Sequence, residues 1–191
     1  RTTAGALWTR LEPYTITVFP FVAGLDAYEI EMSQQQWIDF GAVFRQVHVA
    51  PLPAALRDHL PRETYSSQWR EQVRAYQARA HDETFEDPVA AELARFMRDR
   101  QAVITELVEA AERLGQTLQR EQPDLVLCHA DIHAGNCHIA PDGTLYIVDW
   151  DTAVLAPKER DLMYPGSGLG RGWEREESSD WFDRGYGPAQ V

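Results

Sequence analysis

The chain has 191 residues, of which 44% are hydrophobic and 25% are charged, a composition typical of a globular protein. Its formal net charge of −12 argues against nucleic acid as a partner, because such binding depends on lysine and arginine neutralising phosphates. An acidic surface attracts cations, so the charge is compatible with a cationic substrate, although acidity also serves solubility alone. The sequence contains no apolar run of about eighteen residues and no signal segment, which predicts a cytoplasmic protein without a membrane span.

The first elements are expected to be a strand and a helix. Residues 14–22 read as a β-strand that runs into a connection ending at Gly24. Ser33 and Gln36 form a capping-box pattern, which predicts a helix from there to about His48. Its expected buried face consists of Trp37, Phe40, Phe44 and Val47, which recur at helical spacing.

Two further helical stretches follow the proline-rich loop region. Ser67 is a candidate cap for a helix with Trp69, Val73, Tyr76 and Ala80 on one side. Asp87 and Pro88 form a helix-start signal, an acidic cap followed by proline at the first helical position. Apolar residues then keep a helical rhythm from Leu93 to Leu118. Because about thirty residues is long for one globular helix, we expect a break near Arg100.

After Pro123 the pattern changes to short β runs. Residues 125–127 form one apolar run, while residues 139–140 and 145–148 flank the turn signal at 141–143 and predict a hairpin. The tail from residue 166 is glycine-rich and acidic, and its aromatic residues are expected either to line a substrate site or to pack against further helices, which are expected to be missing here. Strands, a helical block and a hairpin together predict an α+β fold.

The hairpin region carries the strongest chemical signal of the chain. Asp131 follows His129 by two residues, Asn136 follows Asp131 by five, and Asp149 closes the next apolar run. Phosphoryl transfer needs one carboxylate to orient a hydroxyl, and an amide oxygen and a second carboxylate to hold magnesium. We therefore predict Asp131 as the catalytic base, and Asn136 and Asp149 as the ligands of Mg²⁺.

Nearby polar residues are expected to support this set. His129 is predicted to fix the loop backbone by hydrogen bonding, and Asp161 to hydrogen-bond the same backbone from below. Asp151 would be either a second acid behind the metal ligands or an additional ligand. For His133, contact with phosphate or substrate and a solvent-facing position remain equally open.

A zinc hydrolase is the rival chemical interpretation of this segment. Its potential ligands would come from Cys128, His129, Asp131, His133, Cys137 and His138. The segment has no CxxC or HExxH spacing, however, and adjacent strand residues point to opposite faces. The pattern therefore favours the phosphotransferase over the zinc site.

These motifs resemble those of the aminoglycoside phosphotransferase family, which shares the protein-kinase fold. HADIHAGN resembles the family's catalytic loop, and IVDWD resembles its magnesium-binding segment. Residues 18–24 resemble the hinge between its two lobes. The run from Val18 to Glu29, with DWDTAVLAPKERDLM, is most similar to the spectinomycin phosphotransferase-like branch.

The resemblance implies a protein-kinase-like α+β fold in which residues 1–24 form the end of the N-terminal lobe and the hinge. Residues 25–191 would form the helical C-terminal lobe with its catalytic β-hairpin. It also implies ATP and Mg²⁺ as cofactors, with adenine meeting the Pro20 carbonyl and the Val22 amide. The implied substrate is a hydroxylated, cationic small molecule such as an aminoglycoside or aminocyclitol.

The chain departs from the family pattern at both ends. The glycine-rich loop and phosphate-pairing lysine of the family belong before Tyr14, whereas the only lysine here is Lys158. We also expect the final helices of the family to have no counterpart after residue 187. We therefore expect a fragment that is nearly inactive alone, because phosphate clamping contributes much of phosphoryl-transfer catalysis. The alternative is a non-catalytic remnant or binding module that keeps nucleotide affinity without transfer.

Overall fold

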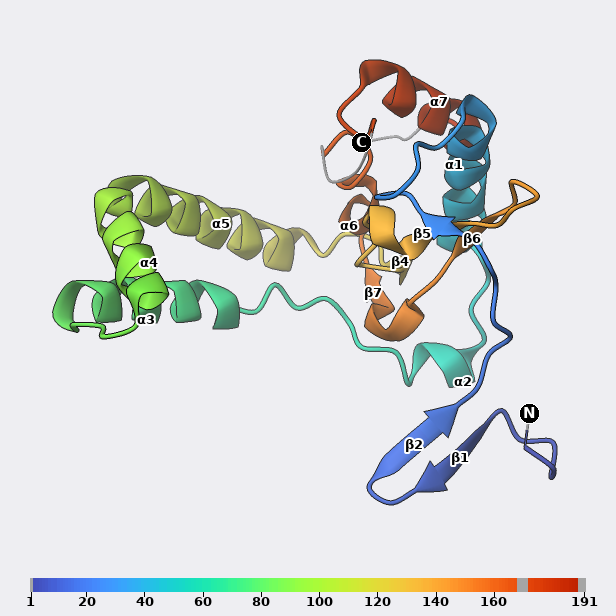
Figure 1. The fold of residues 1–191 in the computed structure, drawn as a ribbon, viewed down its shortest axis with the longest axis horizontal. Coiled ribbons are helices and arrows are strands. Elements are labelled where there is room, and N and C mark those ends of the chain that lie inside the picture. Colours follow the sequence, from blue (N-terminus) through green and yellow to red (C-terminus); the bar gives the residue numbers. More distant parts are fainter. Residues whose placement is uncertain (1, 168–171, 189–191) are drawn as a thin grey trace. The chain divides into compact units, whose positions relative to one another are not determined.

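The computed structural model describes residues 2–167 and 172–188, which combine helices with short strands (Figure 1). The α-helices are α1 (Gln34–Val49), α2 (Ala54–Arg57), α3 (Gln68–Asp82), α4 (Pro88–Asp99), α5 (Gln101–Glu121), α6 (Glu159–Leu162) and α7 (Glu176–Tyr186). The strands are β1 (Trp8–Leu11), β2 (Tyr14–Thr17), β3 (Leu25–Asp26), β4 (Val126–Cys128), β5 (Cys137–Ile139), β6 (Leu145–Ile147) and β7 (Val154–Ala156). Two 3-10 turns are η1 (Ala134–Asn136) and η2 (Trp150–Thr152). The predicted α+β fold class is confirmed.

The chain forms two compact units. The hairpin unit comprises Arg1–Val47, Asp131–Thr152 and Asp161–Val191. The helical unit comprises His48–Ala130 and Ala153–Arg160. The sequence analysis places the boundary between an N-terminal and a C-terminal lobe at residue 24. The two compact units divide the chain at other positions and do not test that boundary, which stays a prediction.

In the hairpin unit, α1 begins with the predicted capping box. The Ser33 amide donates to Gln36 Oε1 at 2.8 Å, and the Gln36 amide donates to Ser33 Oγ at 3.3 Å. Gln36 also donates from Nε2 to the carbonyl of Gly143 at 2.9 Å, which fastens the β5–β6 turn to the start of the helix. Of the predicted inner face, Trp37, Phe40 and Phe44 are each no more than 1% exposed.

The core of the hairpin unit joins α1, α7 and the three-stranded sheet β3–β5–β6. The tail aromatics belong to this core, since Trp173 lies 5.0 Å from Trp37 between ring centroids and Phe182 lies 5.2 Å from Phe40. They pack against α1, a partner that periodicity did not indicate. In the sheet, Cys137 pairs with Ile147 and Ile139 with Leu145, so the predicted hairpin is confirmed.

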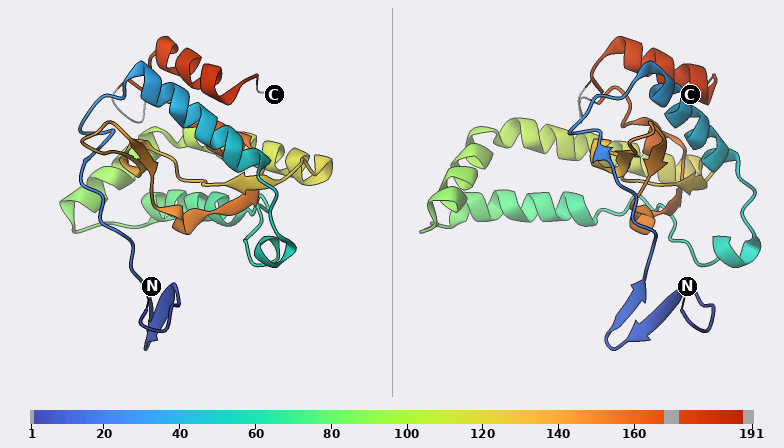
Figure 2. Two further views of the ribbon diagram at one scale, coloured as in Figure 1. Left: turned by 90° about the vertical axis from the view of Figure 1, so that its right-hand side faces the viewer. Right: turned by 45° about the vertical axis from the view of Figure 1, so that its right-hand side comes forward.

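Helices α1 and α7 cross at two glycines and lie side by side in both views (Figure 2). A Cβ atom on Gly41 would overlap the carbonyl oxygen of Phe182, and one on Gly185 would overlap the carbonyl oxygen of Ile38. The two backbones therefore approach more closely than alanine allows at either position. This crossing brings Phe182 and Tyr186 into the core beside α1.

The helical unit contains α3, α4 and α5, with α3 and α5 running side by side (Figure 1). Asp87 caps α4 as predicted, because its Oδ1 accepts from the Ala90 amide at 2.8 Å. The expected break also occurs at Arg100, which separates α4 from α5 with φ −107° and ψ 9°. Ser67 stands at the start of α3, but its side chain makes no capping bond and instead donates to Glu71.

A charged contact links two helices of this unit. Arg70 Nε on α3 donates to Glu112 Oε2 on α5 at 2.9 Å, and Arg74 lies 3.6 Å from the same oxygen. The hydrogen bond from Arg70 lowers the pKa of the Glu112 carboxyl below its ordinary value.

The apolar stripes that give α3, α4 and α5 their helical rhythm are only partly buried within this unit. Ala80, Ala94 and Val108 are buried, but several large members stay more than half exposed. These are Trp69 (74%), Leu93 (58%), Phe96 (56%), Leu107 (65%) and Leu114 (65%). The physical reason is that three packed helices cover only a narrow strip of one another, whereas the stripes in the sequence are wider.

The strand expected over residues 14–22 is wrong in its extent. Strand β2 ends at Thr17 and pairs with β1, a strand that the sequence pattern did not predict, from Trp8↔Thr17 to Leu11↔Tyr14. Residues 18–24 have no regular structure, because Pro20 has no N–H to donate to a ladder. Among the described residues, no helix has the length and apolarity needed to cross a membrane.

We predict that Gly185→Ala lowers the free energy of unfolding by about 3 kcal/mol, because the new methyl group would force α1 and α7 apart. Gly115→Ala in α5 is the matched control. Its methyl would meet Tyr65 Cβ and Arg70 Nη1 at an ordinary 3.6 Å, so helix propensity should raise stability by about 0.5–1 kcal/mol. Urea unfolding monitored by circular dichroism measures both, and equal effects of the two substitutions would contradict the tight crossing.

Candidate active site

Asp131, the predicted base, follows a bend in the backbone after β4. Ala130 adopts a left-handed conformation with φ 69°, which is unusual for a residue with a Cβ atom. His129 is fully buried, whereas the side chain of Asp131 is 42% exposed. The bend thus separates a buried histidine from a carboxylate that a solvent-borne ligand can reach.

Two side chains contact the Asp131 carboxylate. The Tyr164 hydroxyl lies 3.5 Å from Oδ1 and donates to it. His133 Nε2 lies 3.8 Å from Oδ2, close enough for electrostatic attraction but longer than a hydrogen bond. An ionised carboxylate accepts about four hydrogen bonds, so it can contact more than one polar group at a time.

Asn136 is held by the backbone of the catalytic loop. Its Nδ2 donates to the Asp131 carbonyl at 2.7 Å, and its own amide donates to the His133 carbonyl at 2.9 Å. The side chain is buried, at 6% exposure for the residue. Because the amide nitrogen is used internally, Oδ1 is the group of this side chain that remains to hold a ligand.

Asp149 is brought to Asn136 by the register of the hairpin. The Val148 amide donates to the Asn136 carbonyl at 3.0 Å, which extends the β5–β6 pairing to the residue just before Asp149. Asp149 is exposed and left-handed, with φ 62°. A neutral amide oxygen and a carboxylate are therefore presented by neighbouring strands, and oxygen donors of this kind suit a hard divalent cation.

The predicted supporting residues occupy different environments. His129 and Asp161 are buried, at 0% and 1% exposure, so neither is accessible to a substrate from solvent. Asp161 lies in α6, while Asp151 is exposed in η2. Burial agrees with an architectural role for the first two, and their assignment stays a prediction, as does that of Asp151.

The proposed adenine-binding residues lie in the irregular segment 18–24. Pro20 is exposed, and the Val22 carbonyl accepts from His138 Nε2 at 3.0 Å. This bond ties the segment to strand β5 within the hairpin unit. Since its carbonyl is occupied, the Val22 amide is the group of that residue that could meet a base.

The zinc interpretation gains no support from the cysteines. Cys128 Sγ lies 3.5 Å from the Ala156 carbonyl oxygen and 3.4 Å from that of Pro157, and donates to both. Burial raises the pKa of the Cys137 thiol well above its ordinary value. Zinc binds thiolates, and burial disfavours the thiolate form of Cys137.

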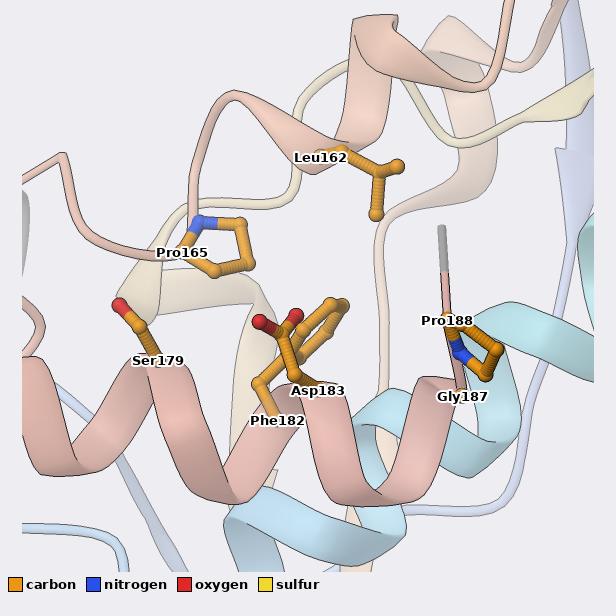
Figure 3. A pocket seen from close by; sticks show the side chains of 7 residues that line it. All are labelled: Leu162, Pro165, Ser179, Phe182, Asp183, Gly187 and Pro188. Atoms are coloured by element: carbon orange, nitrogen blue, oxygen red, sulfur yellow. The ribbon is translucent and has the colours of Figure 1, made fainter. Parts of the chain in front are cut away.

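A pocket of about 480 Å³ lies between α7 and the segment Leu162–Pro165 (Figure 3). The side chains of Ser179, Phe182 and Asp183 project into it from α7, as Figure 3 shows. Tyr164, which contacts Asp131, belongs to the same segment as the opposite wall. The pocket therefore combines an apolar floor with one carboxylate and one hydroxyl.

Sequence reasoning missed two residues of this site. Tyr164 contacts the Asp131 carboxylate, and Tyr28 stacks on His133 with 5.8 Å between ring centroids. Tyr164 lies 33 positions from Asp131, and Tyr28 precedes the catalytic loop by more than a hundred residues. No local pattern marks either tyrosine, because both contacts arise from tertiary packing.

The phosphotransferase enzyme family model matches residues 3–189 of this chain. The crystal structure of spectinomycin phosphotransferase APH(9)-Ia with ADP and spectinomycin is similar at 35% sequence identity and a TM-score of 0.90. That match covers 99% of this chain and 57% of the other. Its AMP-bound complex gives 35% identity and a TM-score of 0.89, covering 99% and 60% of the two chains.

An aminoglycoside phosphotransferase from Alicyclobacillus acidocaldarius shares the fold at 20% identity and a TM-score of 0.59, over 95% of this chain and 56% of the other. No curated protein sequence matches. The chain spans less than two thirds of the length of these structures. By the family match over nearly its whole length, this chain belongs to the phosphotransferase enzyme family and has its protein-kinase-like α+β fold.

Proposed function

We propose that the protein is an ATP-dependent phosphotransferase that moves the γ-phosphate to a hydroxyl of a small molecule. The observation that carries this proposal is the bond from Asn136 Nδ2 to the Asp131 carbonyl, with Asp149 next to Asn136 across the hairpin. One short segment thereby holds an exposed carboxylate beside two oxygen donors. Phosphoryl transfer uses this combination of groups.

In the proposed mechanism Asp131 orients the substrate hydroxyl and accepts its proton at a carboxylate oxygen as the hydroxyl attacks. Asn136 Oδ1 and the Asp149 carboxylate would hold Mg²⁺, and their oxygen chemistry fits this ion. When bound, the ion neutralises charge on the nucleotide phosphates. The internal bond of the Asn136 amide prevents this side chain from rotating its oxygen away from the site.

Nucleotide binding is supported by the similarity to ADP- and AMP-bound structures at 35% identity. In this chain the Pro20 carbonyl and the Val22 amide would meet the adenine. The hydrogen bond from His138 to the Val22 carbonyl favours this arrangement. It holds the backbone of Val22 in place, and the amide of the same residue would meet the adenine.

The proposed substrate is a hydroxylated cation of the aminoglycoside or aminocyclitol class. The net charge of −12 favours a cationic ligand, and the similar structure contains spectinomycin. The pocket on α7 has a volume suited to a small molecule, and Asp183 supplies a carboxylate for an ammonium group. We propose this pocket as part of the substrate site.

We assign the transfer activity to the intact protein and expect little from residues 1–191 alone. The only lysine, Lys158, forms an ion pair with Glu159 at 2.7 Å. A lysine paired in this way is a poor clamp for nucleotide phosphates. The same observation favours a second candidate, a binding module that retains Mg²⁺-dependent nucleotide affinity without transfer.

Asp131→Asn is expected to lower kcat by about 10²–10⁴-fold, because the amide keeps the shape of the carboxylate but cannot accept the proton. Nucleotide affinity and the unfolding midpoint should stay close to those of the wild type. Phosphate transfer to an aminocyclitol, followed by mass spectrometry, and calorimetric titration with Mg·ATP measure these quantities. Asp142→Asn, in the β5–β6 turn, is the control that should retain full kcat.

Retention of full kcat by Asp131→Asn would contradict the role of the base. An intact wild-type protein that binds Mg·ATP but transfers no phosphate would instead support the binding module.

Asp149→Gly is expected to raise the free energy of unfolding by about 1 kcal/mol, because glycine adopts φ 62° without strain. The same variant should lose the Mg²⁺-dependent part of nucleotide binding. Asp151→Gly is the control, since it removes a carboxylate two residues away, where φ is not positive, and should bring no gain. Urea unfolding and calorimetry with and without Mg²⁺ test both effects, and unchanged Mg²⁺ dependence would argue against Asp149 as a ligand.

A further inference from the structure

The imidazole of His133 is packed against Tyr28 and Gly135 within the hairpin unit. The Tyr28 ring stacks on it at 5.8 Å between centroids with an interplanar angle of 26°. Gly135 lies against both rings, since a Cβ atom there would be 2.9 Å from His133 Cε1 and 3.0 Å from Tyr28 Cε2. The ring is therefore oriented by its surroundings, although its side chain is 32% exposed.

The hydrogen bond to Gly135 determines the protonation pattern of neutral His133. The Gly135 amide donates to Nδ1 at 3.1 Å, so Nδ1 must carry a lone pair. In a neutral imidazole the single proton then resides on Nε2. This Nε2–H lies 3.8 Å from Asp131 Oδ2, on the side of the ring that faces the carboxylate.

We propose that His133 is a positioning residue for Asp131, with its Nε2–H attracting Oδ2 electrostatically at 3.8 Å and thereby favouring one orientation of the carboxylate. The inference rests on the proposed function, because it concerns the orientation of the base in phosphoryl transfer. Tyr164 contacts the other oxygen at 3.5 Å, so the two side chains together define the carboxylate plane. A displacement of about 1 Å in such a group can cost up to 10²-fold in rate.

This assignment adds a role to the two that the sequence leaves open for His133. Nδ1 accepts from the Gly135 amide, and Nε2 faces Asp131 at 3.8 Å. The ring is packed against Tyr28 instead of standing free in solvent.

Two substitutions separate the hydrogen bond of Nδ1 with Gly135 from the contact of Nε2 with Asp131. His133→Asn keeps an oxygen acceptor near the Nδ1 position for the Gly135 amide but is too short to reach Asp131. His133→Gln places an amide N–H near the Nε2 position but lacks the acceptor for Gly135. We expect His133→Asn to unfold like the wild type and to lose about 10- to 100-fold in kcat with unchanged KM values. His133→Gln should regain kcat to within a few-fold of the wild type.

Removal of the stacking partner provides an independent variant. Tyr28→Leu should lower kcat because the imidazole loses the ring that orients it, and Tyr28→Phe, which keeps that ring, should lower kcat less. His81→Asn is the control for replacing histidine as such. His81 also lies beside a carboxylate, at 3.0 Å from Asp82 Oδ1, but on the exposed surface of α3, so its kcat should equal that of the wild type.

The outcomes can be distinguished in the intact protein. Wild-type kcat in His133→Asn, or a loss in His133→Gln as large as that in His133→Asn, would overturn the positioning role. A change confined to KM would indicate direct substrate contact and would overturn it as well. Nitrogen-15 NMR of the His133 ring tests the inference without any turnover. An Nε2–H tautomer is expected, whereas an Nδ1–H tautomer refutes the inference even if the wild type transfers no phosphate.

Discussion

The site depends on the hydrogen bond between Asn136 Nδ2 and the Asp131 carbonyl, at 2.7 Å. It closes the loop between the two residues and uses the one part of the Asn136 side chain that cannot bind a cation. The bond is buried, so its loss would leave an amide group without its partner and cost about 1–3 kcal/mol. The residue proposed as the base and a residue proposed as a metal ligand are thus linked by a structural bond within one loop of the chain.

The second constraint is the pairing of β5 with β6. A shift of one residue would turn every side chain of the strand to the other face and move Asp149 away from Asn136. The register is supported from outside the sheet, since Gln36 at the start of α1 binds the Gly143 carbonyl in the turn. The packing of α1 against α7 thereby contributes to the placement of Asp149, the proposed metal ligand, which neither helix contains.

Ala130 and Asp149, which lie beside these two interactions in the chain, both have a left-handed backbone conformation. Each such residue costs about 1–2 kcal/mol, and the conformation persists only where surrounding structure enforces it. At Ala130 the strained bend separates a buried histidine from an exposed aspartate. At Asp149 it ends the strand and directs the chain into η2. In both places the strain lies beside a residue with a proposed chemical role.

Local signals in the sequence were reliable where the structure uses local hydrogen bonds. The capping box at Ser33 and Gln36, the Asp87 cap and the β5–β6 turn each depend on residues a few positions apart. Signals failed where the outcome depended on distant partners. The stripes on α4 and α5 stay largely exposed because the helical unit covers only part of them, and β2 ends early where Pro20 cannot pair.

By itself the sequence determined the residue types of the candidate site and their order, because HADIHAGN and IVDWD contain the residues proposed as a base and two oxygen ligands. It also determined the family and the α+β class. Only the tertiary structure decided the orientation of these groups. The contacts of Tyr164 with Asp131, and of Tyr28 with His133, join residues far apart in the chain, and such contacts leave no periodic trace in a sequence. The chemistry is therefore readable from local order, whereas the geometry follows from packing.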